Sequence, residues 1–97
     1  MSQIKVKVEF SGIARILTGR NEFAVDISDN ISYEEIITEL AKAFPKLIGH
    51  IINEDRRSLF PSNVISVNGK SILQPDDMKG SPSGGDTLIL LSLLAGG

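Results

Sequence analysis

The 97-residue sequence contains no cysteine, and its only histidine is His50. The lack of cysteine excludes disulfides, thiolate catalysis, zinc–thiolate sites and iron–sulfur clusters. A single histidine disfavours a histidine metal site or a histidine-assisted nucleophile, so we interpret His50 as structural. We therefore expect no metal site, no cofactor and no catalytic residue in this chain.

Long apolar runs and an excess of one charge are also absent. No apolar stretch approaches the roughly 20 residues of a membrane span, and the first ten residues alternate instead of forming the apolar block of a signal peptide. Ten basic residues against twelve acidic ones give a net charge of −2, which argues against nucleic acid as a partner. We expect a single cytoplasmic domain without a nucleic-acid or membrane partner.

Two segments in the first third of the chain read as strands. Apolar and charged residues alternate from Ile4 to Phe10, a pattern typical of a strand with one buried and one solvated face. Phe23 to Ile27 repeats the pattern. In the connection between them, Ile13, Ile16 and Leu17 have the spacing of one helical turn.

A capping motif predicts where the main helix begins. Ser32 and Glu35 form a capping box, in which each side chain satisfies a backbone N–H of the other residue. Apolar residues then follow at helical spacing as far as Phe44. Pro45 disfavours helical geometry at the residue before it, so the helix should end there. Pro45 can itself open a short second turn that carries Leu47, Ile48 and Ile51.

The last third of the chain predicts three more strands. Val64 to Val67 reads as one strand, Asn68-Gly69 favours a type I′ turn, and Ser71 to Leu73 returns as a short partner. Thr87 to Leu94 barely alternates, as is typical of a central strand with a parallel neighbour. One of its two side-chain sets must point away from the helix, where either a loop covers it or it forms an apolar patch for a partner. The two sets are Leu88, Leu90 and Leu94, and Ile89, Leu91 and Leu93.

The order of these elements predicts the fold class. It is strand, strand, helix, strand, short strand, strand, which we interpret as an α+β fold. We expect a mixed sheet of four to five strands with one main helix packed on one face. The first and last strands should pair at the centre of this sheet.

The sequence ends in Gly96-Gly97, directly after its most apolar stretch. Glycine loses more backbone entropy on ordering than any other residue, so a terminal pair adds nothing to a core. At an average glycine usage of roughly 7%, such an ending occurs by chance about once in two hundred proteins. A frayed end or a remnant of cloning are the plain alternatives. We divide the chain into a domain, residues 1–93, and a C-terminal tail, residues 94–97.

Four short motifs follow one another along the chain. They are Phe10 with Arg15 and Gly19, then Val67-Asn68-Gly69, then Gly85-Asp86, and finally Ala95-Gly96-Gly97 after an apolar strand. In this order they resemble the ubiquitin-like β-grasp proteins, and within them the sulfur-carrier branch. That branch includes the small subunit of molybdopterin synthase, the thiazole-pathway carrier and small ubiquitin-like modifier proteins. The resemblance covers nearly the whole chain and implies a β-grasp fold.

The resemblance implies a carrier, not an enzyme. An E1-like adenylating enzyme that uses ATP would activate the carboxylate of Gly97, and sulfur transfer would convert it to a thiocarboxylate. Leu94, Ala95 and Gly96 would pass through a narrow channel of the partner, and Gly96 and Gly97, which have no Cβ, would avoid a clash with its walls. Because the chain has no cysteine to carry a persulfide, the terminus is its only candidate for carrying sulfur.

The sequence leaves several functions open. The thiocarboxylate can serve the large subunit of molybdopterin synthase, or Gly97 can be joined to lysines of target proteins as in a modifier. A non-covalent β-grasp binding module is a third possibility. A thiazole-pathway carrier is a fourth, although the extended loops at 53–63 and 74–86 look less like that compact branch.

Overall fold

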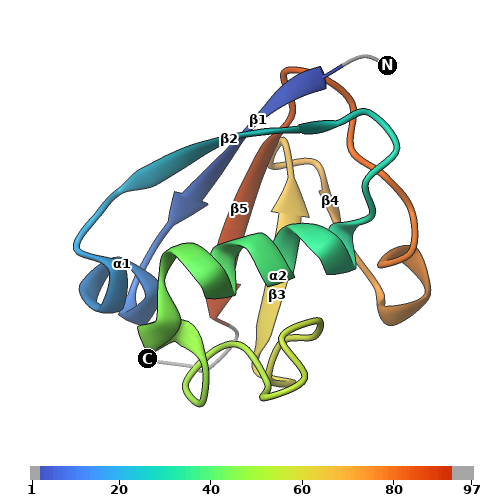
Figure 1. The fold of residues 1–97 in the computed structure, drawn as a ribbon. Helices are drawn as coiled ribbons and strands as arrows, with labels where there is room; N and C mark the ends of the chain where they lie inside the picture. Colours follow the sequence, from blue (N-terminus) through green and yellow to red (C-terminus); the bar gives the residue numbers. More distant parts are fainter. Residues whose placement is uncertain (1–2, 93–97) are drawn as a thin grey trace.

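The computed structural model describes residues 3–92, and the expected tail lies outside them (Figure 1). In chain order the elements are β1 (Gln3–Phe10), α1 (Ile13–Thr18), β2 (Glu22–Ser28), α2 (Tyr33–Ala43), the 3-10 helix η1 (Pro45–Leu47), β3 (Asn63–Val67), β4 (Ser71–Ile72), the 3-10 helix η2 (Pro75–Asp77) and β5 (Thr87–Ser92). This is the α+β arrangement that the sequence predicts. No helix within residues 3–92 is long and apolar enough to cross a bilayer.

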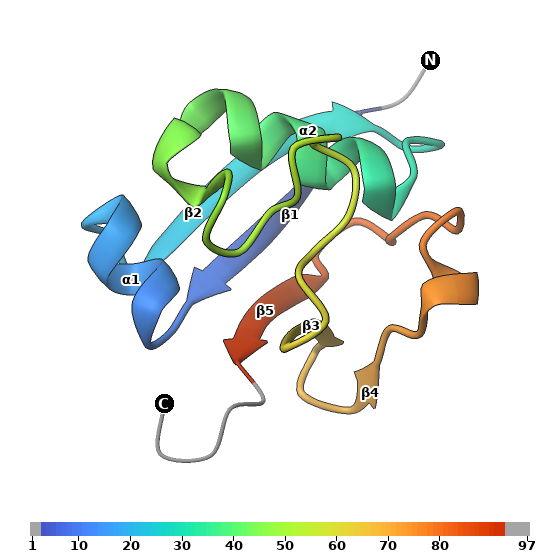
Figure 2. The ribbon, with the colours of Figure 1, turned by 90° about the horizontal axis from the view of Figure 1, so that it is seen from below.

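The five strands form one mixed sheet in the order β2-β1-β5-β3-β4 (Figures 1 and 2). β1 and β5 run parallel, with Lys7 beside Thr87 and Phe10 beside Leu90. The other neighbours are antiparallel. The predicted central pairing of the first and last strands is confirmed, and β5 therefore has a strand on each side.

One face of the sheet carries the core. In β1, Val6 and Val8 are completely or almost completely buried, whereas Lys5 and Lys7 point to the other face and form ion pairs of 3.6–3.9 Å with neighbouring carboxylates. Because these lysines are partly or largely exposed, their ion pairs contribute little to stability. The alternation in the sequence thus separates a core face from a solvated outer face.

The main helix α2 begins and ends where the sequence predicts. The Glu35 N–H donates to Ser32 Oγ at 3.2 Å, and the Ser32 N–H donates to Glu35 Oε1 at 3.1 Å, which completes the capping box. The helix ends before Phe44, and η1 begins at Pro45. Its apolar stripe, which includes Ile37, packs on the core face of the sheet (Figure 1).

The β3–β4 hairpin has the predicted turn but a shorter second strand. Asn68 and Gly69 have φ values of 56° and 70°, and a type I′ turn requires positive φ at both positions. β4 ends at Ile72, one residue earlier than predicted. The Leu73 N–H nevertheless donates to the Ile65 carbonyl at 2.9 Å, so the chain stays beside β3 after the strand ends.

The expected helical turn after β1 is the short helix α1. It packs on the core through Ala14, which is 2% exposed. Gly19 closes the helix in the left-handed region with φ 71°, and its N–H donates to the Arg15 carbonyl at 2.9 Å. α1 lies at the end of the sheet where the β1 arrow points (Figures 1 and 2).

Candidate functional site

The central strand β5 buries one set of side chains and leaves the other near solvent. Leu88 and Leu90 are 1% and 2% exposed, and both face the helices. Ile89 and Leu91 point to the outer face and are half-buried. Leu93 and Leu94, which belong to the same two sets, lie outside the described residues. The helix-facing set of the last strand is therefore the one that contains Leu88 and Leu90.

The outward side chains of β5 join others to form an apolar strip on the outer face. Ile89 stands opposite Ser66 of β3, and Leu91 stands opposite Val64. Ile72 of β4 stands on the far side of Ser66. We call Val64, Ile72, Ile89 and Leu91 the outer strip. The β1–β2 half of the same face carries charged pairs instead, so the apolar half is the part suited to a partner.

The C-terminal end of β5 determines where the predicted tail begins. Ser92, the last described residue, pairs with Asn63 at the start of β3. On the other side, the Ser11 hydroxyl donates to the Leu90 carbonyl at 3.1 Å. Ser92 therefore lies near the centre of the sheet, between the start of β3 and the segment that leads into α1. The predicted site residues Leu94, Ala95, Gly96 and Gly97 all lie beyond this point, outside the described residues.

At its other end, β5 is held by two of the motifs that carry the family resemblance. The Asn68 amide donates from Nδ2 to Asp86 Oδ1 at 3.0 Å, and Asn68 Oδ1 accepts from the Thr87 N–H at 2.8 Å. The Asn68 N–H donates to the Thr87 carbonyl at 2.7 Å. Gly85 precedes this contact with φ 86°, a conformation that favours glycine. Hydrogen bonds that join the Asn-Gly and Gly-Asp motifs thus hold the chain where the central strand begins.

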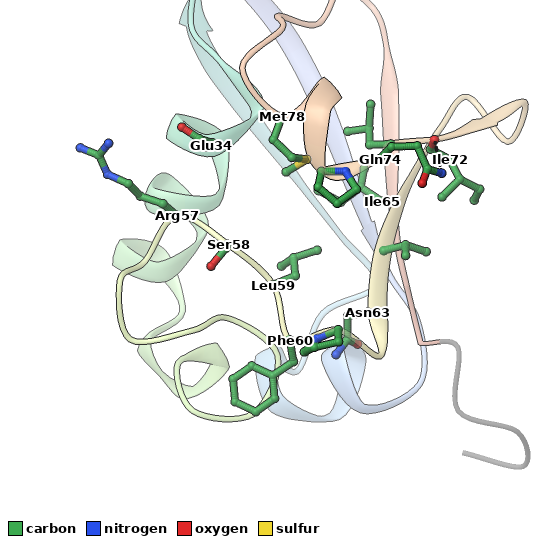
Figure 3. A pocket seen from close by; sticks show the side chains of 14 residues that line it. Glu34, Arg57, Ser58, Leu59, Phe60, Asn63, Ile65, Ile72, Gln74 and Met78 are labelled. Atoms are coloured by element: carbon green, nitrogen blue, oxygen red, sulfur yellow. Dashed lines mark hydrogen bonds between the residues drawn. The ribbon is translucent and has the colours of Figure 1, made fainter.

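A groove of about 620 Å³ lies between the segment 57–61 and the segment 72–75 (Figure 3). Leu59, Ile65 and Met78 line its interior, and Glu34 and Arg57 lie at its edge. Its surface is mostly apolar, so it is suited to an apolar group rather than to acid–base chemistry. No group of three His, Asp or Glu side chains that could hold a metal ion occurs within residues 3–92.

The loop after α2 contains two exposed arginines, Arg56 and Arg57, and is held by hydrogen bonds. Asp55 accepts from the Arg57 N–H at 2.8 Å, and this bond, with further ones from Ser58, holds the pKa of the Asp55 carboxyl below its usual value. The Arg56 carbonyl accepts from the Thr38 hydroxyl at 2.6 Å, which ties the loop to α2. Arg56 itself has φ 62°, which costs a residue with a side chain about 1–2 kcal/mol.

No protein-family model and no curated protein matches the sequence. Solved structures do match the fold. The crystal structure of small archaeal modifier protein 1 from Haloferax volcanii has a TM-score of 0.80 at 18% identity, over 96% of this chain and 99% of that chain. The chain has the ubiquitin-like β-grasp fold.

Two further β-grasp structures cover almost the whole length. The solution structure of small archaeal modifier protein 1 from Methanosarcina acetivorans has a TM-score of 0.78 at 20% identity, over 100% of both chains. A putative molybdopterin converting factor subunit 1 from Pyrococcus furiosus has a TM-score of 0.70 at 22% identity, over 94% of this chain and 99% of that chain. The β-grasp fold that the motifs imply is therefore confirmed.

Proposed function

We propose that this protein is a sulfur carrier whose C-terminal Gly97 is activated by an E1-like adenylating enzyme and converted to a thiocarboxylate, for molybdopterin biosynthesis. The observation that carries the proposal is the position of the tail. Leu-Leu-Ala-Gly-Gly follows directly on Ser92, the last described residue of the central strand of a β-grasp fold. In this proposal residues 94–97 are the segment that reacts, and the folded domain presents this segment to the partner enzymes.

The proposed chemistry takes place at one carboxylate. An oxygen of the Gly97 carboxylate attacks the α-phosphorus of ATP, and pyrophosphate leaves. A hydrosulfide equivalent supplied by a sulfur donor then displaces AMP from the acyl-adenylate, which leaves a thiocarboxylate. The large subunit of molybdopterin synthase would accept this sulfur. In this proposal the chain contributes only its terminal carboxylate to the reaction, and the partner enzymes supply the catalysis.

Three properties support this proposal. Gly96 and Gly97 have no Cβ, so a tail that ends in them fits a narrow channel. β5 has a hydrogen-bonded strand on each side, so the last described strand before the tail lies inside the sheet and not at its edge. The outer strip, to which β5 contributes Ile89 and Leu91, offers a partner an apolar surface. The similar structure from Pyrococcus furiosus, a putative molybdopterin converting factor subunit, is the reason for naming molybdopterin as the pathway.

A second candidate function is that of a ubiquitin-like modifier. The likeness to two structures of small archaeal modifier protein 1 favours it. In that case an activated Gly97 forms an isopeptide bond with the lysine Nζ of a target protein, and AMP leaves. Adenylation by an E1-like enzyme is common to both functions, so only the fate of Gly97 separates them. A purely non-covalent binding module would leave Gly97 unmodified.

Mass spectrometry of protein from native cells tests these functions. A carrier yields intact chain in which sulfur replaces an oxygen, with fragmentation placing the change at Gly97. Because oxidation of Met1 or Met78 adds nearly the same mass, trapping with a thioacid-selective reagent is the control. A modifier yields target lysines that bear a tryptic branch beginning after Lys79 and ending in Leu-Leu-Ala-Gly-Gly. Branched lysines without sulfur at Gly97, in cells that make molybdopterin, would reverse the order of the two functions.

A further inference from the structure

The short helix α1 turns an apolar surface toward solvent. Ile16 is 79% exposed and Ile13 is 49% exposed. Among the large hydrophobic residues within 3–92, these two are the most exposed, and Ile72 follows at 42%. Ile13 and Ile16 are three positions apart and therefore neighbours on one side of the helix. Ala14 and Leu17, on another side, pack against the core. Two exposed isoleucines on a six-residue helix form a surface without an evident role in the fold.

The same segment is basic although the chain is acidic overall. Residues 11–21 contain Arg15 and Arg20 and no acidic residue, whereas the whole chain has a net charge of −2. The Arg20 guanidinium is already engaged, because its Nε donates to the Glu22 carbonyl at 3.2 Å and it lies over the Phe23 ring. Arg15 is exposed and takes part in none of the ion pairs among residues 3–92. Its guanidinium is therefore available to a carboxylate of another molecule.

The position of α1 connects this surface with the tail. The segment into α1 is bound to β5 by the Ser11–Leu90 hydrogen bond of 3.1 Å, two residues before Ser92. Five residues follow Ser92 in the sequence, and a fully extended chain of five residues spans at most about 18 Å. An enzyme that holds the Gly97 carboxylate in its active site must therefore come close to the end of the sheet where α1 lies.

We infer that Ile13, Arg15 and Ile16 form a docking surface for the adenylating enzyme that takes up Gly97. The enzyme surface that fits it is an apolar hollow for the two isoleucines, bordered by a carboxylate for Arg15. This inference rests on the proposed function and adds a recognition element to it. Together with the tail, α1 gives the enzyme a second point of attachment, so that binding strength does not depend on the five tail residues alone.

Steady-state kinetics tests the inference. The full-length chain is the substrate in an ATP–pyrophosphate exchange assay with the E1-like adenylating enzyme of the same organism. Ile16→Asp should raise KM for the carrier by about tenfold or more, as truncation of an interface anchor does, while kcat stays close to wild type. Arg15→Glu should raise KM several-fold, and added salt should diminish this increase.

Matched variants separate recognition from general effects of substitution. Ile16→Leu keeps an apolar side chain, and Arg56→Glu reverses the charge of an exposed arginine in the loop tied to α2, so both should retain the wild-type KM. Thermal melts should show all four variants folded, because Ile16 and Arg15 are exposed.

The outcomes distinguish the two levels of the proposal. If the enzyme activates the wild-type chain but Ile16→Asp and Arg15→Glu keep its KM, the docking surface is refuted and the carrier function stands. If no adenylation of the wild-type chain occurs, the proposed function fails, and the docking surface fails with it. An equal rise in KM for Arg56→Glu and Arg15→Glu would show a general charge effect and would also refute a specific role of α1.

Discussion

The Asn68 side chain donates a hydrogen bond to the Asp86 carboxylate at 3.0 Å and joins the β3–β4 turn to the start of β5. The second oxygen of Asp86, Oδ2, accepts from the Ser83 N–H at 2.9 Å, and the Asp86 carbonyl accepts from the Lys7 N–H at 3.1 Å. These bonds connect the loop before β5 with both neighbouring strands. We therefore assign the Asn-Gly and Gly-Asp motifs to the folding of the domain rather than to its chemistry.

Replacing Asn68 should destabilise the protein. Asn68→Ala removes two side-chain hydrogen bonds. It also leaves an alanine at φ 56°, where its side chain cannot form the hydrogen bonds with which asparagine offsets the backbone strain. We expect the free energy of unfolding to fall by about 1–3 kcal/mol in urea denaturation. Asn68→Gly relieves the backbone strain but also loses the side-chain bonds, so its stability should lie between those of wild type and Asn68→Ala. An alanine variant as stable as wild type would contradict this role of Asn68.

Deleting Gly96 and Gly97 should separate folding from function. The buried residues of the described chain end at Leu90, so removal of the last two glycines should leave the melting temperature nearly unchanged. The same deletion should abolish ATP-dependent adenylation by the partner enzyme, because the activated carboxylate is moved back to Ala95. Normal adenylation of the shortened chain would exclude the carrier and the modifier functions together.

The two faces of β5 should respond differently to truncation. Leu90→Ala empties a site in the core and should cost about 2–5 kcal/mol of unfolding free energy. Leu91→Ser, on the outer strip, should cost much less because that side chain is only half-buried. It should instead weaken binding of the partner enzyme, measured by calorimetry. If Leu91→Ser destabilises the protein as strongly as Leu90→Ala, the outer strip is part of the core and not a partner surface.

Stability should decrease in acid partly through the capping box. Hydrogen bonds from Ser32 hold the pKa of Glu35 below its ordinary value of 4.5. A carboxyl whose pKa is lower in the folded state stabilises the fold above the unfolded pKa, and this contribution disappears as pH falls through the folded pKa. The difference in melting temperature between wild type and Glu35→Gln should therefore be largest near neutral pH and diminish in acid. An identical difference at every pH would show that the Glu35 charge plays no part.

The sequence predicts every strand and the main helix of this fold because each has a local cause. The capping box at Ser32 and the proline at 45 define both ends of α2, and alternation defines β1. The exposure of Ile13 and Ile16 could not be predicted, because apolar residues at helical spacing normally indicate a buried face. It depends on how α1 packs, with Ala14 as its inward contact, and thus on tertiary structure.

The proposed role of the tail residues rests on a sequence motif and not on the fold. By contrast, which face of β5 points outward follows from pairing with β1. Val8 beside Leu88 and Phe10 beside Leu90 place these leucines on the helix side. The apolar sequence of β5 alone left two choices, since both of its side-chain sets are apolar. The register of β5 against β1 decides which set faces the helices, and no local pattern within β5 encodes that register.

The parallel pairing of β1 with β5 also governs the order in which the molecule can fold. Lys7 and Thr87 lie at opposite ends of the chain, so forming this contact closes a loop that contains most of the protein. Contacts of such sequence separation carry a large entropic cost and slow folding. The β1–β2 hairpin and α2 are local and can form earlier, whereas the strand that precedes the tail gains both neighbours only when the whole sheet closes. A partner that recognises the tail together with the neighbouring strands will therefore discriminate completely folded chains from partly folded ones.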